Sequence, residues 1–453
     1  MQLSSWYKMK IAVINPPSLS NKSFIREGRC TQSSSIWSLV YPPLSLAQTA
    51  SYIRENIQCE ILGYDYAVLS KNFVSASDEI VQQCFDIVFI ATGSPSIVSD
   101  IEFAKKVKES SPNTKIVLIG THVTQFASEL INRHSFIDII IHNEPEQSAL
   151  DIVKSLSLEN SLTDILGIST RDYSNKESNF IPNLDLLPFP AWDLFDLSKY
   201  TLPIRGKKFL MISPQRGCPW KCTFCTAPLY YGNKIRSKST ERIRQEIEYI
   251  KSEYKVNNFL FWSDTFTANS SYVKELCDSI EDLDISWVSN SRVDTITPDL
   301  ALAMSKSGCW LLTYGIESLQ EDVLSKVKKG FTTDSISSGV AAAQNAGIQT
   351  IGHFIVGLPG DNISGARNTF SKAIKLNLDY MQFYYASPFP GTELYNDMLA
   401  SGEVPNDIHY SPAQSTNTLH AEYKKTMFYI KMRTLIRFKT IFFILKNLKI
   451  RFS

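Results

Sequence analysis

Three cysteines near the middle of the chain have the residue type and spacing that metal chemistry requires. Cys218, Cys222 and Cys225 form a C-x3-C-x2-C pattern, and Phe224 stands just before the third cysteine. Such a run can bind three corners of a cubic iron–sulfur cluster, which normally has four thiolate ligands. One iron would then be open to a ligand that is not protein. A structural zinc site is a weaker interpretation, because zinc needs four ligands and the sequence has no second cysteine pair.

The elements that must position these cysteines are predicted to form a barrel-like α/β unit. Six β-rich runs alternate with helix-length segments, for example 240–254 and 335–346. This alternation predicts a partial (β/α)6 TIM barrel, with function at the carboxyl ends of its strands. The cysteine pattern follows the first strand. The predicted strands are Leu210–Ser213, Asn258–Trp262, Asp284–Ser289, Trp310–Ile316, Gln349–Val356 and Tyr380–Ala386.

A doubly wound parallel sheet of Rossmann-like type is predicted for the N-terminal part. Its apolar runs are uninterrupted, as in strands buried on both faces, and helix-length segments such as 44–56 and 99–110 separate them. Ligands of such sheets bind beyond the carboxyl ends of the strands, and here those ends are small, polar and glycine-containing. The predicted strands are Lys10–Asn15, Cys59–Asp65, Asp86–Thr92, Lys115–Gly120, Asp138–His142 and, as a further candidate, Ile165–Thr170.

The composition indicates a folded cytoplasmic protein. The chain has 453 residues, 43% of them hydrophobic, and a formal net charge of +1. Residues 424–453 contain nine Lys or Arg and no Asp or Glu, so the remainder is acidic, which argues against a nucleic-acid partner. The five other cysteines are scattered irregularly, which indicates a reducing compartment. We expect no signal peptide, and no uncharged apolar stretch reaches the roughly 18 residues of a membrane span.

With its flanking residues, the cysteine segment Gly217–Ala227 closely resembles the signature of radical S-adenosylmethionine (SAM) enzymes. In that family the amino and carboxylate groups of SAM chelate the open iron of a 4Fe-4S cluster. One electron from the cluster cleaves SAM to a 5′-deoxyadenosyl radical, which abstracts hydrogen. The resemblance covers about residues 209–396 and implies an enzyme whose cluster ligands and catalytic residues are Cys218, Cys222 and Cys225.

Further residues at the predicted strand ends match the elements with which this family binds SAM. Each alone has a simpler explanation, such as a helix cap, a turn or a local ion pair. Their order after successive strands favours the resemblance. The implied contacts are Phe224 and Pro359 near the adenine, Asp264 near the methionine amino group, Ser289 and Arg292 near the ribose or carboxylate, and Glu317 near the ribose or amino group.

The N-terminal strand ends resemble those of the cobalamin-binding domain that precedes many radical SAM barrels. One departure is that the D-x-H-x-x-G motif, which supplies the lower histidine ligand of cobalt in some cobalamin proteins, is absent. His122 is therefore expected in a loop and not on cobalt, whose lower face would be open or water-bound. The cobalamin contacts that the resemblance implies are Pro17, Thr92, Ser94, Thr121, His122 and Glu144.

Taken as a whole, the chain looks like a class B, cobalamin-dependent radical SAM enzyme, similar to the branch of anaerobic magnesium-protoporphyrin ester cyclase and hopanoid-modifying enzymes. The resemblance implies methylation of an unactivated carbon in a lipophilic or secondary-metabolite substrate, with a flavodoxin- or ferredoxin-type reductant. One alternative is a non-methylating radical SAM cyclase or rearrangement enzyme. Another, from a different class, is a non-catalytic iron–sulfur electron carrier or sensor.

The expected organisation is a cobalamin-binding domain (8–170), a linker rich in Pro and Asp (171–208), the barrel (209–400) and a C-terminal extension (401–453). In the extension, apolar residues recur every three or four positions, with basic residues off this stripe. This pattern predicts a basic helix that either packs over the barrel or binds an anionic membrane surface. The stripe consists of Phe428, Met432, Leu435, Phe438, Phe442, Leu445, Leu448 and Phe452.

Overall fold

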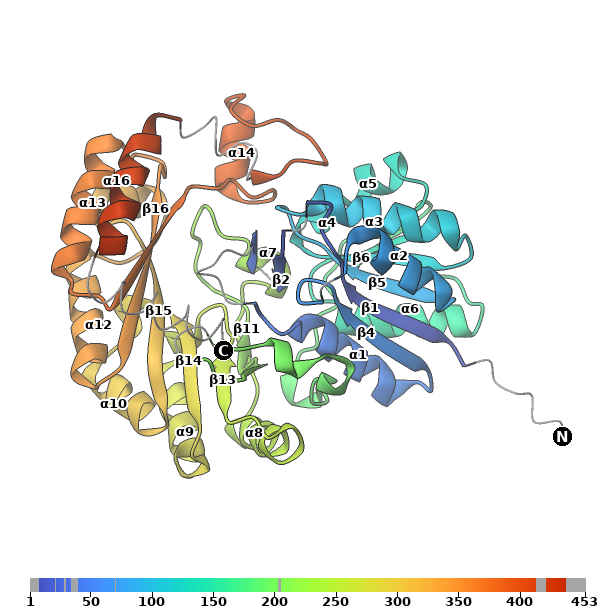
Figure 1. Ribbon diagram of the computed structural model, residues 1–453, viewed down its shortest axis with the longest axis horizontal. Coiled ribbons are helices and arrows are strands. Elements are labelled where there is room, and N and C mark those ends of the chain that lie inside the picture. The colour runs from blue at the N-terminus through green and yellow to red at the C-terminus, as the bar shows by residue number, and fades with distance from the viewer. Residues whose placement is uncertain are drawn as a thin grey trace.

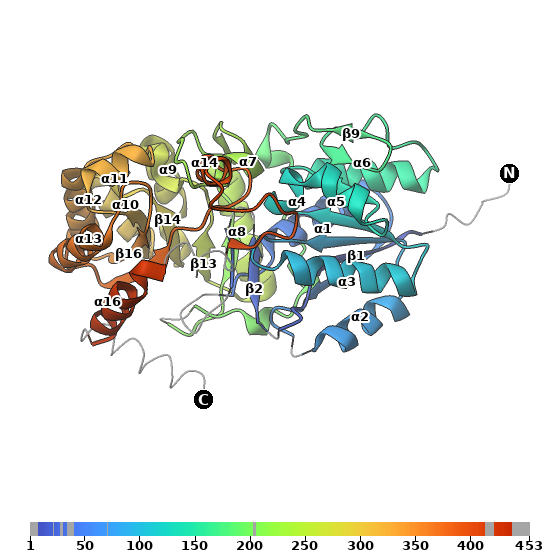
Figure 2. The same ribbon diagram turned by 90° about the horizontal axis from the view of Figure 1, so that it is seen from above.

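The computed structural model describes residues 8–20, 22–27, 30–33, 40–69, 71–202, 205–412 and 421–436. It contains two α/β units that lie side by side, with the N-terminal unit on the right of Figure 1 and the barrel on the left. Helices α7 (Ala227–Tyr231) and α14 (Glu393–Ala400) lie at the boundary between the two units (Figures 1 and 2). None of the helices among the described residues is long and apolar enough to cross a membrane.

The N-terminal unit contains a seven-stranded sheet with the order β4-β1-β5-β6-β7-β8-β9. The first five of these are parallel, which confirms the predicted sheet, whereas β8 and β9 extend it in antiparallel fashion. The further candidate strand, Ile165–Thr170, is thus only a short antiparallel one. The bounds are β1 (Lys10–Asn15), β4 (Glu60–Asp65), β5 (Ile87–Ala91), β6 (Lys115–Ile119), β7 (Ile139–Ile141), β8 (Ile168–Ser169) and β9 (Ser174–Asn175).

Helices cover both faces of this sheet, which explains its uninterrupted apolar runs. Ile11 and Val13 of β1 belong to the same core as α1 and α6, whereas Ala12 and Ile14 belong to the core shared with α2, α3 and α5. Because β1 lies between β4 and β5, the winding direction changes there, and ligands of such sheets bind at this switch point. The helices are α1 (Leu44–Asn56), α2 (Phe73–Gln82), α3 (Ile97–Ser110), α4 (Thr121–Gln125), α5 (Ala127–Arg133) and α6 (Glu146–Ser157).

A hairpin of β2 (Phe24–Glu27) and β3 (Cys30–Ser33), which the sequence did not predict, lies at this switch point. Its Arg26 donates to Asn15 Oδ1 at 2.7 Å and to Asp100 Oδ1 at 2.7 Å. Both side chains of the Arg26–Asp100 pair are almost fully buried. The hairpin is therefore fastened to the carboxyl end of β1 and to α3 by a buried charge pair.

The segment between the two units is ordered by short 3-10 helices, η1 (Leu184–Leu186), η2 (Trp192–Leu194) and η3 (Leu197–Lys199). Trp192 and Tyr200 are fully buried in it. The Tyr200 hydroxyl donates to Asp65 Oδ2 at 2.6 Å, at the carboxyl end of β4. This segment is thus packed against the first sheet.

The second unit contains six parallel strands in the order β10-β13-β14-β15-β16-β17, which confirms the predicted partial barrel. Helices lie on its outer side, and the opposite face looks toward the N-terminal unit (Figure 1). The strands are β10 (Leu210–Ile212), β13 (Asn258–Phe261), β14 (Ser286–Ser291), β15 (Cys309–Glu317), β16 (Gln349–Val356) and β17 (Tyr380–Tyr385). The helices are α8 (Thr240–Tyr254), α9 (Ser270–Ile280), α10 (Pro298–Lys306), α11 (Glu321–Lys326), α12 (Thr333–Asn345) and α13 (Ile363–Lys375).

The last described helix, α16 (Lys424–Ile436), contacts α13 and β17. This agrees with the prediction that a helix of the C-terminal extension packs over the barrel. The residues that it buries are Thr426, Met427 and Ile430, whereas Phe428 and Met432 of the predicted stripe are 68% and 42% exposed. The predicted packing face was therefore wrong for these two residues, because the barrel contacts a different side of the helix. The side chain of Leu435, and the stripe residues from Phe438 onward, lie outside the described part of the chain.

Candidate functional site

The cysteine loop (Cys218–Cys225) is held by backbone hydrogen bonds to three separate elements. Cys218 N donates to Gly232 O at 3.1 Å, Thr223 N donates to Val327 O at 3.2 Å, and Leu394 N donates to Thr223 O at 2.8 Å. Hydrogen bonds from several sides thus hold the loop in one place. The side chain of Cys218 is buried, whereas those of Cys222 and Cys225 are partly exposed.

Gly217, just before the loop, has a backbone that only glycine adopts readily. Its φ is +94°, and a Cβ there would lie 2.1 Å from the carbonyl oxygen of Lys234. Its N–H donates to Asp264 Oδ2 at 3.2 Å. The structure thereby joins the start of the cysteine loop to the polar residue that follows β13.

The described residues include no group of three or more His, Cys, Asp or Glu side chains placed to hold a single metal ion. A cubic cluster places each cysteine on a different iron, so its ligands need not converge on one point. That the three cysteines bind a cluster therefore stays a prediction. The residues around the loop indicate whether a cluster with bound SAM would fit there.

Phe224 brings the cysteine loop next to the end of β16. It packs against a small apolar cluster that contains Val323, Val327 and Leu358. Leu358 and Pro359 belong to a turn in which Gly357 and Gly360 have φ of +83° and +86°. The predicted adenine-side residues, Phe224 and the 357–360 turn, are thus neighbours.

Arg292, after β14, reaches the other side of the loop. Its guanidinium lies 3.8 Å from the ring centroid of Trp220, which belongs to the loop. The same group pairs with Asp294 at 3.0 Å and donates to Lys329 O at 2.8 Å. Arg292 thus forms the local ion pair with Asp294 that was the simpler explanation of this residue. The same pair holds Arg292 against the cysteine loop.

Glu317 ends β15 in a strained backbone position. Its φ is +67°, and the register with β16 is irregular between Gly315 and Glu317. Bulges and left-handed non-glycine residues occur often at functional sites. Its carboxylate accepts from Lys329 Nζ at 2.8 Å, and a Cβ at Gly315 would lie 2.5 Å from Glu317 Oε1. The missing side chain at Gly315 thus makes room for this charge pair.

Several buried polar atoms around the loop have no hydrogen-bond partner among the residues that the structure describes, which fits a polar ligand at this place. Buried polar groups in proteins are usually paired, so orphaned ones need an explanation. Ser289 is not among them, because its hydroxyl donates to Phe261 O at 2.9 Å. The orphaned atoms in this region include Gln215 Oε1, Trp220 Nε1, Thr223 Oγ1, Thr265 Oγ1 and Ser291 Oγ.

The predicted cobalamin contacts lie at the strand ends of the N-terminal unit, and several of them already bond to other protein groups. The Thr92 hydroxyl donates to Ile119 O at 2.8 Å. The prediction of a loop at His122 was wrong, because the residues after Gly120 form the short helix α4. His122 is fully buried there, with Nδ1 3.1 Å from Ser94 Oγ and Nε2 2.8 Å from Ile408 O. Burial lowers the pKa of His122 to about 4. Both of its nitrogens are used within the protein, so its contact with a cofactor stays a prediction. Pro17 follows β1, Thr121 begins α4, and both are buried.

A small pocket opens at these strand ends and reaches Tyr230 of α7, at the boundary with the barrel. Gly120, which lines it, has φ of +142°, and a Cβ there would lie 2.5 Å from Thr92 O. Small residues at this edge leave the backbone accessible, as a ligand docked on the strand ends requires. The lining residues are Arg26, Ser45, Leu46, Ala91, Thr92, Ile119, Gly120, Pro145 and Tyr230.

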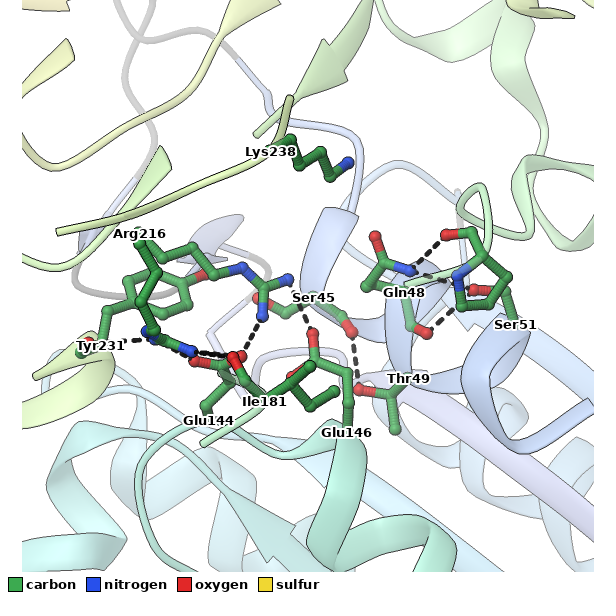
Figure 3. Close-up of polar contacts among 12 residues, drawn as sticks. Ser45, Gln48, Thr49, Ser51, Glu144, Glu146, Ile181, Arg216, Tyr231 and Lys238 are labelled. Carbon is green, nitrogen blue, oxygen red and sulfur yellow. Dashed lines mark hydrogen bonds and ion pairs between the residues drawn. The ribbon is translucent and has the colours of Figure 1, made fainter. Parts of the chain in front are cut away.

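A buried group of charges joins the two units and was missed by the sequence analysis. We call Arg216, Arg236, Glu144 and Glu146 the charge clamp. Arg216 donates to Glu144 at 2.5 Å and to Glu146 at 2.8 Å (Figure 3). Arg236 donates to Glu144 at 2.6 Å. The side chains of Arg216 and both glutamates are at most 3% exposed. Breaking such a buried pair typically costs about 3–5 kcal/mol.

The clamp bears directly on the predicted cysteine site. Arg216 ends β11 (Gln215–Arg216), two residues before Cys218, and Arg236 begins the paired strand β12 (Arg236–Ser237). Glu144 and Glu146 follow β7 of the first sheet. Glu144, a predicted cobalamin contact, is therefore engaged by two arginines, and its contact with cobalamin stays a prediction.

The buried carboxylate of Glu27 predicts that the stability of the protein depends on pH. Its carboxylate accepts from Ser45 Oγ at 2.6 Å, and burial raises its pKa from 4.5 to about 7. A raised folded-state pKa contributes stability below pH 4.5 that is lost as the pH rises through 7, here on the order of 3 kcal/mol. Glu27→Gln removes the group that causes this loss. The melting temperature of the variant, relative to that of the wild type, should therefore be higher at pH 8 than at pH 5. Thermal melts at both values test this, and a pH-independent difference would contradict it.

Comparison with known proteins places the chain among related sequences and structures. Residues 212–373 match the family model described as the radical SAM superfamily. An uncharacterized methyltransferase of Pyrococcus horikoshii is 33% identical over 80% of this chain and 79% of that protein. The anaerobic magnesium-protoporphyrin IX monomethyl ester cyclase of Rubrivivax gelatinosus is 23% identical over 80% of this chain and 67% of its own length.

A similar fold is found in the radical SAM methyltransferase TsrM of Kitasatospora setae, whose structure was solved with cobalamin and a 4Fe-4S cluster bound. The TM-score is 0.69 at 13% identity, with 91% of this chain and 85% of that chain covered. The likeness extends over both α/β units. It confirms the predicted combination of an N-terminal Rossmann-like sheet and a radical SAM barrel.

Proposed function

The chain belongs to the radical SAM superfamily, and from this premise we propose that it is a cobalamin-dependent enzyme that methylates an unactivated carbon of a lipophilic or secondary-metabolite substrate. A radical SAM enzyme requires a 4Fe-4S cluster, SAM, a one-electron reductant and a substrate. Cobalamin, the methyl transfer and a flavodoxin- or ferredoxin-type reductant are the finer parts of the proposal. Relatives named as methyltransferases support it.

The charge clamp is the observation that carries the proposal. Arg216 fastens the strand leading into the cysteine loop to glutamates at the carboxyl edge of the first sheet. The two places where this fold would hold its cofactors, the barrel mouth and the strand ends of the N-terminal unit, therefore adjoin. A methyl carrier and a radical source must act on one substrate, and their sites must face a common space.

In this proposal Cys218, Cys222 and Cys225 would hold the cluster. When bound, the cluster and SAM supply a radical that abstracts hydrogen, and cobalamin supplies a carrier for the methyl group. Glu317 and Arg292 would orient SAM through charge and hydrogen bonds, and the orphaned hydroxyls of Thr223 and Ser291 lie at the same end of the barrel to bond it. Asp264 and Ser289, with Phe224 and Pro359 on the adenine side, complete the proposed SAM contacts.

The cobalamin part can be tested without a substrate. We expect the purified full-length chain to retain stoichiometric cobalamin on gel filtration after incubation with hydroxocobalamin, as measured by its visible absorption. A variant that lacks all three loop cysteines should retain as much, because the strand-end site does not depend on the cluster. Loss of all cobalamin from the wild-type chain on the column would contradict cobalamin dependence.

A non-methylating cyclisation or rearrangement is the second candidate. The observation that favours it is the similarity to an anaerobic cyclase over most of both chains. The two candidates differ in whether the methyl group of SAM appears in the product. A label in that methyl group therefore separates them.

A further inference from the structure

One face of β16 points into the interior of the barrel. The residues of this strand alternate between buried and partly exposed positions, and the partly exposed ones are Gln349, Ile351, His353 and Ile355. Ile355 packs against the same small apolar cluster as Phe224 of the cysteine loop, whereas Phe354 on the other face belongs to the same core as Phe370 of α13. The face that carries His353 therefore looks toward the cysteine loop.

Strand pairing aligns polar side chains from β16 and β17 on this face. His353 pairs with Gln382, and Ile355 pairs with Tyr384, in parallel register. Paired residues of neighbouring strands share one face of a sheet. On the other side His353 pairs with Gly315, where no side chain competes for space. His353, Gln382 and Tyr384 thus form one polar group inside the barrel.

Hydrogen bonds within this group fix the protonation of the imidazole. The Tyr384 hydroxyl donates to Gln382 Oε1, and His353 Nδ1 lies 3.2 Å from the Tyr384 oxygen. With the Gln382 amide oriented so that Oε1 accepts, the single hydroxyl proton is used, and His353 Nδ1 is assigned as the donor in the second bond. Burial lowers the pKa of His353 to about 4, so the ring is neutral at pH 7. His353 Nε2 is then a hydrogen-bond acceptor.

Two atoms of this group have no partner within the described residues. They are His353 Nε2, an acceptor, and Gln382 Nε2, a donor, and both side chains are only partly buried. The nearby charges of Glu317 and Lys329 are paired with each other at 2.8 Å. The interior of the barrel therefore presents a neutral acceptor beside a neutral donor, on paired positions of adjacent strands.

We propose that His353 and Gln382 recognise the substrate, and that the part of the substrate held there is a neutral edge with a donor beside an acceptor, such as a lactam, an amide or an N-heterocycle. This inference rests on the proposed function, because it places the substrate inside the barrel near the cysteine loop. A hydrocarbon at this place would leave both polar atoms unpaired, and a phosphate would meet no free cation among the described residues of this group.

The substrate class can be tested with the small-molecule extract of the source cells as the probe. The extract is separated into a chloroform-soluble fraction, an anionic fraction and a neutral water-soluble fraction. Each is incubated with the reconstituted enzyme, reductant and SAM that carries a deuterated methyl group. We expect the labelled product in the chloroform-soluble or the neutral water-soluble fraction, because the proposed edge is uncharged. His353→Phe and Gln382→Leu should each lower kcat/KM for it by about 10- to 100-fold, chiefly through KM.

Matched variants separate recognition from packing. His353→Asn offers an acceptor again and should recover part of the loss, whereas Gln344→Leu removes an amide that bonds Asn377 O outside the barrel and should leave kcat/KM unchanged. Label confined to the anionic fraction, or unaffected by the His353 and Gln382 variants, would overturn the inference and leave methyl transfer intact. Label in no fraction, despite SAM cleavage, would contradict the proposed function itself and the inference with it.

A second measurement needs no substrate. Histidine-selective nitrogen NMR of the full chain should show His353 with its proton on Nδ1, and Tyr384→Phe should shift this signal because it removes the phenol oxygen that accepts that proton. A proton on Nε2 in the wild-type chain would overturn the assignment of an acceptor in the barrel.

Discussion

Replacing Cys222 by alanine is expected to abolish reductive cleavage of SAM, down to the level measured without protein. The loop supplies three thiolates, so loss of one leaves only two for the cluster, and clusters held by so few thiolates are not retained. Cys222 is partly exposed and the loop is fixed by backbone bonds, so both α/β units should still fold. The measurement is 5′-deoxyadenosine by mass spectrometry after anaerobic reconstitution and reduction, with the iron content and visible absorption of the cluster recorded in parallel.

The matched control is Cys84→Ser, because Cys84 is an exposed free thiol of the N-terminal unit. This variant should keep the cluster and the rate of SAM cleavage. An intact cluster in Cys222→Ala, or a wild-type cluster that never cleaves SAM, would indicate a fourth protein ligand. Either result would favour the electron-carrier or sensor alternative.

Replacing Glu317 by glutamine is expected to weaken SAM binding by about 10- to 100-fold and to leave the cluster intact. The change keeps the shape of the side chain and removes its charge, which leaves the buried ammonium of Lys329 without its 2.8 Å partner. A hydrogen bond to a charged group contributes about 1.5–3 kcal/mol, which sets the size of the effect. Equilibrium binding of SAM to the reconstituted, unreduced protein measures it directly.

Two further variants test whether the effect comes from the position and charge of the Glu317 carboxylate. Gly315→Ala should weaken SAM binding in the same direction, because its Cβ would lie 2.5 Å from Glu317 Oε1 and displace the carboxylate. Glu321→Gln removes an exposed carboxylate that bonds Thr333 and should have no effect. If Glu317→Gln bound SAM as tightly as the wild type, Glu317 would not be a SAM contact. Its positive φ would then be explained by the β-bulge alone.

The predictable parts of this fold are those with a local signal. The bounds of β1, α1, α8 and β16 match the prediction from apolar runs and periodicity. The order of polar residues after successive barrel strands was also readable, because parallel strands bring their carboxyl ends to one edge. The structure accordingly gathers Phe224, Arg292 and Glu317 around the cysteine loop.

The parts that could not be predicted depend on contacts between distant segments. Arg216 and Glu144 are 72 positions apart, and nothing in either local sequence distinguishes a buried ion pair from two surface charges. The same holds for Arg26 and Asp100 under the β2–β3 hairpin. In α16 the spacing gave a helix but not its buried side, because two apolar stripes were available and the barrel contacts the one with Met427 and Ile430.

The most direct test of the proposed function is the mass of the product formed from SAM with a deuterated methyl group. The enzyme is reconstituted with its cluster and cobalamin, reduced, and supplied with the substrate fraction that it converts. We predict a product that carries the intact deuterated methyl group, together with 5′-deoxyadenosine and S-adenosylhomocysteine in equal amounts. A converted product without the label, formed alongside 5′-deoxyadenosine, would contradict methyl transfer and support a cyclisation or rearrangement.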